Sequence, residues 1–283
     1  MDEKIAAFHI LSRKYLIEIL QNLKNELLEL SKKVEKILEE TDDYQDKRIM
    51  DLNMDLNIRY PYWYVRRDIL SVILIRIESI SPKDFNSLDE IKKIVIQEYE
   101  KANISERKHY SDISKELRIS ICNEEKQKFY DYISNIDENS LKEVDELFYR
   151  RVISDEKIKE IKKRINEKRN NVEFEGKDFM WFNREYFRNE ININDLLDIF
   201  RRKKIERIYE INTGGIDSAS YLMDLSALDF YFTDGFNIYW CSDEMNWMIE
   251  ENHEDFYLIY GEWLIKEIKR IRPNWKEGIF DRL

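Results

Sequence analysis

The stretch FYFTDGFNIYWCSDEMNWMIEENHEDFYLIYGEWLIKEIKRI, residues 230–271, decides the class of fold. Asp234-Gly235 is a two-residue hairpin signal, and it stands between the aromatic and β-branched runs 230–233 and 236–241. In the register that this turn sets, both faces of the hairpin are apolar. We therefore expect a hairpin that is covered on both sides.

The rest of this stretch extends the hairpin. Residues 245–250 and 256–260 predict two more strands, separated by an acidic turn. Glu262–Ile271 has apolar residues at helical spacing, and Pro273 ends that helix. The pattern predicts a small antiparallel β-meander with a closing helix.

The first 40 residues carry the clearest helical pattern. Apolar residues alternate spacings of four and three over three heptads, at Leu16, Leu20, Leu23, Leu27, Leu30, Val34 and Ile37. Two interpretations are open: a long helix in a bundle of its own chain, or a homodimer seam through Leu16–Ile37. Leu28 and Leu38 widen the apolar stripe, which favours the bundle.

Six Gly and three Pro are few for 283 residues, and this scarcity favours long helices. Capping residues and apolar spacing predict helices at 61–80, 88–99, 105–122, 140–148 and 155–169, with a polar loop or a short turn of helix at 41–57. Further on we expect a strand at 205–211 and a short helix at 218–225. The predicted fold class is α+β: a helical bundle over residues 1–170 and an aromatic-rich region with the meander over 171–283. Whether the two parts share one core stays open.

Composition narrows the class of protein. The net charge is −11, so the chain as a whole is not drawn to nucleic acid or to an anionic membrane. Cys122 and Cys241 have no metal-binding or redox spacing, which predicts buried thiols in a reducing compartment. No HExxH, G-x-S-x-G or Walker A motif is present, and we expect no metal site and no cofactor. The N-terminus lacks a signal-peptide core, and the most apolar stretch, 69–80, is too short and too charged to span a bilayer. We expect a cytoplasmic protein.

A glycine-rich string, Thr213-Gly214-Gly215-Ile216-Asp217-Ser218, lies between an expected strand and an expected helix. It resembles the Ser-Gly-Gly-x-Asp-Ser loop of PP-loop ATP pyrophosphatases, whose backbone N–H groups hold pyrophosphate. Thr213 replaces the first serine, and the matching positions are Gly214, Gly215, Asp217 and Ser218. The resemblance implies a nucleotide-binding enzyme as an alternative function. A Gly-Gly turn followed by a helix cap explains the same residues structurally, and we favour that explanation.

Carboxylates and aromatic residues gather in the meander. The set that we expect to contact a partner comprises Trp240, Asp243, Glu244, Trp247, Glu251, His253 and Glu254. Acids beside a histidine can hold a metal or transfer protons, although charges in turns are commonly just solvated. Exposed aromatic residues beside acids also suit a protein contact. None of these residues matches a sequence motif for a catalytic nucleophile.

A basic segment precedes the meander. Its cations include Arg150, Arg151, Lys159, Lys162, Lys163 and Arg164, which we expect on one helix. Two interpretations are open. These cations form a docking surface for nucleic acid or for an acidic partner, or they lie on a solvated helix face with i,i+4 ion pairs. The acidity of the whole chain favours the solvated face.

Residues 230–271 as a whole resemble the end of small bacterial proteins found among polymorphic-toxin immunity and phage-defence genes. The shared pattern is a Phe/Tyr strand, a Trp-bearing strand with an acidic turn, a Trp/His strand pair, and Gly before an amphipathic helix. The resemblance covers about a sixth of the chain. It implies a non-catalytic protein that binds a basic toxin or a phage component. We therefore expect protein binding, in bacterial immunity or defence.

Overall fold

The structure is a computed structural model that describes residues 2–41, 43, 45–104, 113–170, 179–191, 193–213, 219–228, 238–252, 254 and 256–279. The chain divides into two units, Met1–Leu147 (unit 1) and Phe148–Leu283 (unit 2). Unit 1 is helical, whereas unit 2 is built on a seven-stranded sheet. The fold is α+β, as the sequence predicts.

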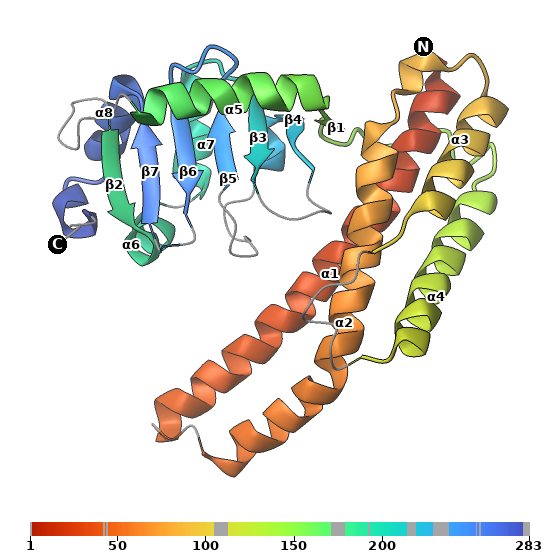
Figure 1. The fold of residues 1–283 in the computed structure, drawn as a ribbon, viewed down its shortest axis with the longest axis horizontal. Helices are drawn as coiled ribbons and strands as arrows, with labels where there is room; N and C mark the ends of the chain where they lie inside the picture. The colour runs from red at the N-terminus through yellow and green to blue at the C-terminus, as the bar shows by residue number, and fades with distance from the viewer. Residues whose placement is uncertain are drawn as a thin grey trace. The chain divides into compact units, whose positions relative to one another are not determined.

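Unit 1 is built around a long antiparallel hairpin of two helices. In the described residues it consists of α1 (Glu3–Thr41), α2 (Lys47–Ser79), the short 3-10 helix η1 (Pro82–Asp84), α3 (Leu88–Lys101) and α4 (Lys115–Ser134). Helices α3 and α4 pack beside this hairpin, and its far end, where α1 passes into α2, extends beyond them (Figure 1). The large apolar side chains of Leu28 and Met50 near that end are exposed.

The heptad pattern of α1 faces its own chain. Leu16 and Leu23 are buried in the core of unit 1, and Leu20 and Leu27 pack against that core. The indole N–H of Trp63 on α2 also donates to the Leu23 carbonyl at 2.9 Å. The half of the stripe from Leu16 to Leu27 thus packs within a helical hairpin, as the bundle interpretation expects, and the homodimer seam stays a prediction.

The helices of unit 1 differ from the sequence-based predictions at several places. Helix α2 begins at Lys47, where Asp46 caps it by accepting the N–H of Arg48 at 2.8 Å, so residues 47–57 are helical and the loop interpretation of 41–57 was wrong over them. Lys47, Arg48 and Asp51 are exposed positions on this helix. The predicted helix at 140–148 is also absent from the described residues, because the Asp137 carboxylate accepts the N–H groups of Asn139 and Ser140 and closes a turn.

The predicted start of helix α3 is confirmed. Ser87 caps α3 by accepting the N–H of Glu90, and the Glu90 carboxylate accepts the N–H of Asn86 in return. Helix α4 covers the second half of the predicted 105–122 helix and continues to Ser134, while residues 105–112 lie outside the described part.

Unit 2 contains one antiparallel sheet of seven strands in the order β1-β4-β3-β5-β6-β7-β2. The strands are β1 (Arg150–Val152), β2 (Phe179–Asn183), β3 (Arg207–Asn212), β4 (Tyr221–Asp224), β5 (Ile238–Cys241), β6 (Met248–Glu251) and β7 (Phe256–Tyr260). Strands β5, β6 and β7 are consecutive neighbours, which confirms the last three strands of the predicted meander, whereas its first strand, 230–233, lies outside the described residues.

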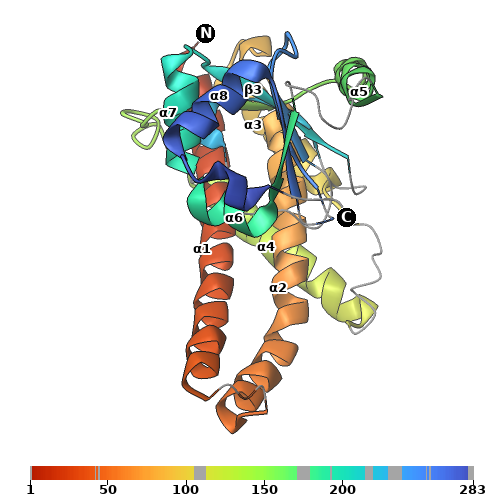
Figure 2. The ribbon, with the colours of Figure 1, turned by 90° about the vertical axis from the view of Figure 1, so that its left-hand side faces the viewer.

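Helices cover both faces of this sheet. Helix α5 (Asp155–Asn170) lies on one face, and α6 (Arg184–Glu190), α7 (Ile193–Arg202) and α8 (Glu262–Ile271) lie on the other (Figure 2). Along β5, Tyr239 and Cys241 enter the core under α5, whereas Trp240 enters the core under α6–α8. Burial on both faces agrees with the expectation for this aromatic strand.

Several predictions for unit 2 need correction. The expected short helix at 218–225 contains strand β4, whose Tyr221 and Met223 are buried at strand spacing. Arg150 and Arg151 lie on β1 and not on the basic helix. Helix α5 was assigned to the bundle, but its Ile161 and Ile165 belong to the core of the sheet, so the chain divides after Leu147 and not after residue 170. The Asp234-Gly235 turn lies outside the described residues.

Candidate functional site

The acidic residues expected to contact a partner lie at two ends of one strand. Asp243 and Glu244 are exposed in the turn from β5 to β6, and Glu254 is exposed in the turn from β6 to β7. A strand rises about 3.3 Å per residue, so the four residues of β6 hold these turns roughly 13 Å apart. His253 lies outside the described residues. These carboxylates therefore do not form one compact site.

The remaining members of that set are inside unit 2. Trp240 and Trp247 are each 1% exposed, and Glu251 is 0% exposed. The Trp240 indole N–H donates to Glu210 at 3.1 Å, while the Trp247 ring packs 4.5 Å from the ring of Phe200. Large side chains at these positions fill the core and present no surface to a partner.

The glycine-rich string falls almost wholly outside the described residues, which include only its first member, Thr213. Strand β3 precedes it, as predicted, but strand β4 follows it and pairs antiparallel with β3, Arg207 opposite Asp224. Residues 213–220 thus connect a β-hairpin. A nucleotide-binding loop would be followed by a helix, because the helix N-terminus would supply the N–H groups that bind phosphate.

The cations of the basic segment are largely engaged with their own unit. On α5, Lys157 pairs with Asp243 at 2.9 Å and with Glu160 at 3.2 Å, and Arg164 pairs with Glu160 at 3.6 Å. The Lys157 ammonium lowers the pKa of Asp243. Lys159 and Lys163 are exposed, and Lys162 is half-buried. This pattern is that of a helix face with local ion pairs.

Two adjacent carboxylates on β6 are fully buried, one on each face of the sheet. Under α5, the Tyr239 hydroxyl donates to Glu250 at 3.3 Å, and the Arg169 guanidinium lies 3.6 Å from the same carboxylate. We expected Glu251 at a partner-binding surface, and no sequence pattern indicated that Glu250 is buried. Both carboxylates carry arginine partners, which is how proteins keep a buried charge tolerable.

On the opposite face, α6 supplies the partners of Glu251. Arg188 Nη2 donates to Glu251 Oε1 at 2.6 Å, and Arg184 Nε lies 3.5 Å from it. Burial, followed by the Glu251 charge, raises the pKa of Tyr257, so this phenol stays protonated beside the carboxylate. The cluster fixes α6 against the end of the sheet where β2 finishes.

An open, polar hollow of about 460 Å³ lies where β2 passes into α6, next to the 3-10 helix η4 (Trp275–Gly278). It is lined by Asn183, Glu185, Tyr186, Asn189, Glu190, Glu277 and Ile279. Asn183 builds one wall, because its side chain caps α6 by accepting the N–H of Glu185 at 2.9 Å and of Tyr186 at 3.3 Å. The hollow therefore sits on a capped helix start.

The charge of this hollow, which we name the acidic hollow, is one-sided. Glu185, Glu190 and Glu277 are exposed, and none of them forms an ion pair within the described part of the chain. Arg272 lies nearby, but its guanidinium donates to the Glu190 carbonyl and to Asp195. The hollow thus presents three carboxylates and no cation in its described lining.

Tyr186 is the aromatic member of the acidic hollow. Its ring stacks on Phe182 at 6.1 Å, and its hydroxyl is shielded from solvent without a hydrogen-bond partner among the described residues. Burial, together with Glu190 and Glu277, raises the pKa of Tyr186. Sequence reasoning noticed the aromatic crowding here but not the hollow, because Glu185 and Glu277 are 92 residues apart in the sequence.

No group of three or more His, Cys, Asp or Glu residues in the described ranges is arranged to hold a metal ion. Among those residues, none of the helices combines the length and the apolar character that crossing a bilayer requires. Comparisons of the chain with protein families, with curated proteins and with solved structures found no match.

Proposed function

We propose that this protein binds another protein without catalysis, and that the acidic hollow receives a basic segment of that partner. The observation that carries the proposal is the one-sided charge of the hollow: Glu185, Glu190 and Glu277 line it without a cation among its described residues. Carboxylates that line one open hollow create a negative potential there, which attracts a lysine or arginine side chain of a partner.

The shape of the hollow suits a side chain that reaches in from a partner. It is open and not enclosed, and Tyr186 and Ile279 add an aromatic and an apolar surface to its carboxylates. Lysine and arginine carry an apolar stem and a charged head, so one such side chain can contact Tyr186 and a carboxylate together. Tyrosine and arginine are also frequent in the residues that dominate protein–protein affinity.

The sequence resemblance to immunity and phage-defence proteins indicates the kind of biological process in which this binding takes place. An immunity protein that neutralises a basic toxin, or a defence component that recognises a basic phage protein, needs an acidic face of this kind. The protein's net charge of −11 also increases the rate at which a basic partner is captured. We infer that the partner is a basic protein in such a conflict system.

Affinity capture from the native host tests this function. The bait is compared with the triple variant Glu185→Gln/Glu190→Gln/Glu277→Gln, and with Asp243→Asn/Glu244→Gln/Glu254→Gln, which removes the same number of charges elsewhere in unit 2. We expect a basic protein that the wild type and the second variant retain and that the first variant loses. Retention of all captured proteins by the hollow variant would contradict the proposal.

A further inference from the structure

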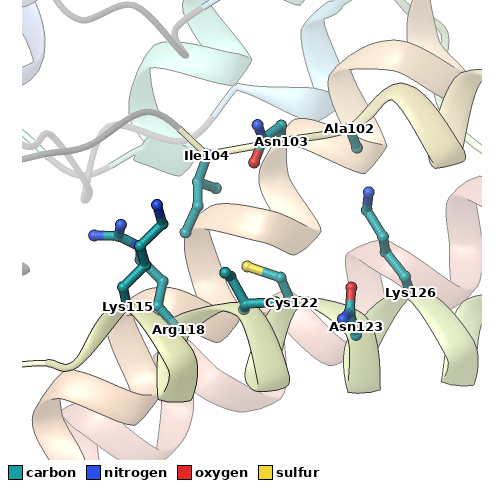
Figure 3. Close-up of a pocket in the computed structure, with 9 residues that line it drawn as sticks. Ala102, Asn103, Ile104, Lys115, Arg118, Cys122, Asn123 and Lys126 are labelled. Atoms are coloured by element: carbon teal, nitrogen blue, oxygen red, sulfur yellow. The ribbon is translucent and has the colours of Figure 1, made fainter.

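A second cavity, of about 260 Å³, lies within unit 1 between α4 and the segment that follows α3. Arg118, Cys122 and Lys126 line it from one face of α4 at spacings of four residues, and Figure 3 shows Arg118 and Lys126 on either side of Cys122. Lys115, Ile119 and Asn123 complete that wall, while Ala102, Asn103 and Ile104 form the opposite one.

This cavity, the basic pocket, collects positive charge without a carboxylate among the described residues that line it. Of these nine lining residues, three are cations, Lys115, Arg118 and Lys126, and none is acidic. The adjacent face of the same helix is different: Lys128 pairs with Glu124 at 2.7 Å and with the buried Glu125 at 2.9 Å. Helix α4 therefore places Lys128 beside carboxylates on one face and presents Lys115, Arg118 and Lys126 to the cavity on another.

Lys126 is held in place by the fold. Its ammonium donates to the Glu100 carbonyl at 2.9 Å, one of the carbonyls at the end of α3 that has no partner within the helix. An ammonium has three donors, so this bond positions Lys126 and leaves donors for a ligand. Burial lowers the pKa of Lys126, which means that its charge would be better stabilised by a bound anion.

We propose that the basic pocket binds the phosphate group of a small phosphate monoester. A phosphate oxygen pair matches the planar donors of Arg118, the two lysines add compact positive charges, and Asn103 and Asn123 offer amide donors. Ile104 and Ile119 provide an apolar edge for a small organic group. The volume lies just below the usual range of ligand pockets, roughly 300–1,000 Å³, so the ligand is small. The site is in unit 1 and is separate from the acidic hollow of unit 2.

The two cysteines supply a direct test, because Cys122 lines the basic pocket while Cys241 is buried in unit 2. The rate at which iodoacetamide alkylates Cys122 is measured with inorganic phosphate, phenyl phosphate, phenol and matched chloride, and affinities are measured by calorimetry. We expect both phosphates to slow alkylation, phenol and chloride to have no effect, and phenyl phosphate to bind more tightly than inorganic phosphate.

Variants decide whether the pocket cations are responsible. Lys126→Gln and Arg118→Gln should each weaken phenyl phosphate binding about tenfold, as expected for loss of a charge-assisted hydrogen bond. Lys126→Arg should keep most of the affinity, and Lys93→Gln, an exposed cation on α3, should leave it unchanged. Absence of binding at about 10 mM ligand, or equal affinity in all variants, overturns the site. Equal affinity for inorganic and phenyl phosphate overturns the assignment to a monoester.

Discussion

The guanidinium of Arg188 on α6 donates to the carboxylate of Glu251 on β6 at 2.6 Å, and that carboxylate has no exposed surface. This contact links the helix that forms one wall of the acidic hollow to the middle of the meander. A buried carboxylate without its cation is costly, so the pair fixes where α6 lies. The position of the acidic hollow therefore depends on the buried ion pair between Arg188 and Glu251.

Arg188→Met should destabilise unit 2 by about 2–3 kcal/mol, because it removes the shortest cation contact of the buried Glu251 carboxylate, at 2.6 Å, and keeps the longer contact to Arg184. Urea unfolding followed by tryptophan fluorescence measures this, since five of the six tryptophans lie in unit 2. Arg201→Met is the control: its exposed pair with Asp198 should contribute less than about 1 kcal/mol. If both substitutions lowered the free energy of unfolding by the same amount, the Arg188–Glu251 contact would stabilise unit 2 no more than an exposed ion pair does.

Alkaline pH should weaken unit 2. Burial raises the pKa of the Cys241 thiol to about 12 and raises the pKa of Tyr257 as well. Both groups keep their protons in the folded state and release them on unfolding, so stability is full below the unfolded pKa values and falls as pH rises above about 9. Between its pKa in the unfolded chain and its pKa in the folded protein, each of these two groups lowers the free energy of unfolding by about 1.4 kcal/mol per pH unit.

Cys241→Val isolates the thiol contribution, because valine fills a similar volume and does not titrate. Urea unfolding at pH 8 and at pH 10.5 should give a smaller loss of stability for this variant than for the wild type. The same pH dependence in both proteins would rule out a thiol that stays protonated in the fold.

Gly278→Ala should distort the acidic hollow. An ideal Cβ at Gly278 would lie 1.9 Å from Cδ1 of Tyr186, so the ring must move to accept a methyl group. We expect a loss of stability of about 1–3 kcal/mol, the usual cost of overpacking, and weaker partner binding. The double variant Gly278→Ala/Tyr186→Ala removes the clash and should recover part of the stability. If Gly278→Ala alone is neutral in thermal unfolding, Tyr186 does not occupy this position in solution.

Leu23→Ala tests the two interpretations of the heptad stripe. If Leu23 packs within the α1–α2 hairpin, the substitution should cost about 2–5 kcal/mol without changing the molecular mass in sedimentation. Trp63, the tryptophan of unit 1, reports this unfolding because its indole N–H donates to the Leu23 carbonyl. A wild-type dimer that Leu23→Ala converts to monomers would instead support the homodimer seam.

Local patterns predicted much of this fold. The meander strands, the closing helix Glu262–Ile271 and the Ser87 cap follow from alternation, apolar spacing and capping chemistry, all of which act over a few residues. The sequence did not reveal β1 and β2, which are edge strands. Arg150–Val152 and Phe179–Asn183 are short and become strands only by pairing with β4 and β7, which are distant in the sequence.

The candidate site was less predictable than the fold. Trp240 and Trp247 looked like contact residues because aromatic side chains serve both in cores and in interfaces, and only the packing of α6–α8 over the sheet decides between the two. The acidic hollow joins Glu185 and Glu190 of α6 to Glu277 of η4, and no local pattern indicates that these elements meet. Burial of Glu250 and Glu251 likewise depends on arginines more than 60 residues away.

The affinity of the captured basic partner, measured by calorimetry at low and at high salt, tests the central claim most directly. The account predicts that Glu185→Gln/Glu190→Gln/Glu277→Gln weakens binding about 100-fold at low salt and by a smaller factor at about 0.5 M salt, since screening removes much of the electrostatic attraction. Asp243→Asn/Glu244→Gln/Glu254→Gln, with the same change in net charge, should bind within a few-fold of the wild type. An equal loss of affinity in the two triple variants would contradict a site at the acidic hollow.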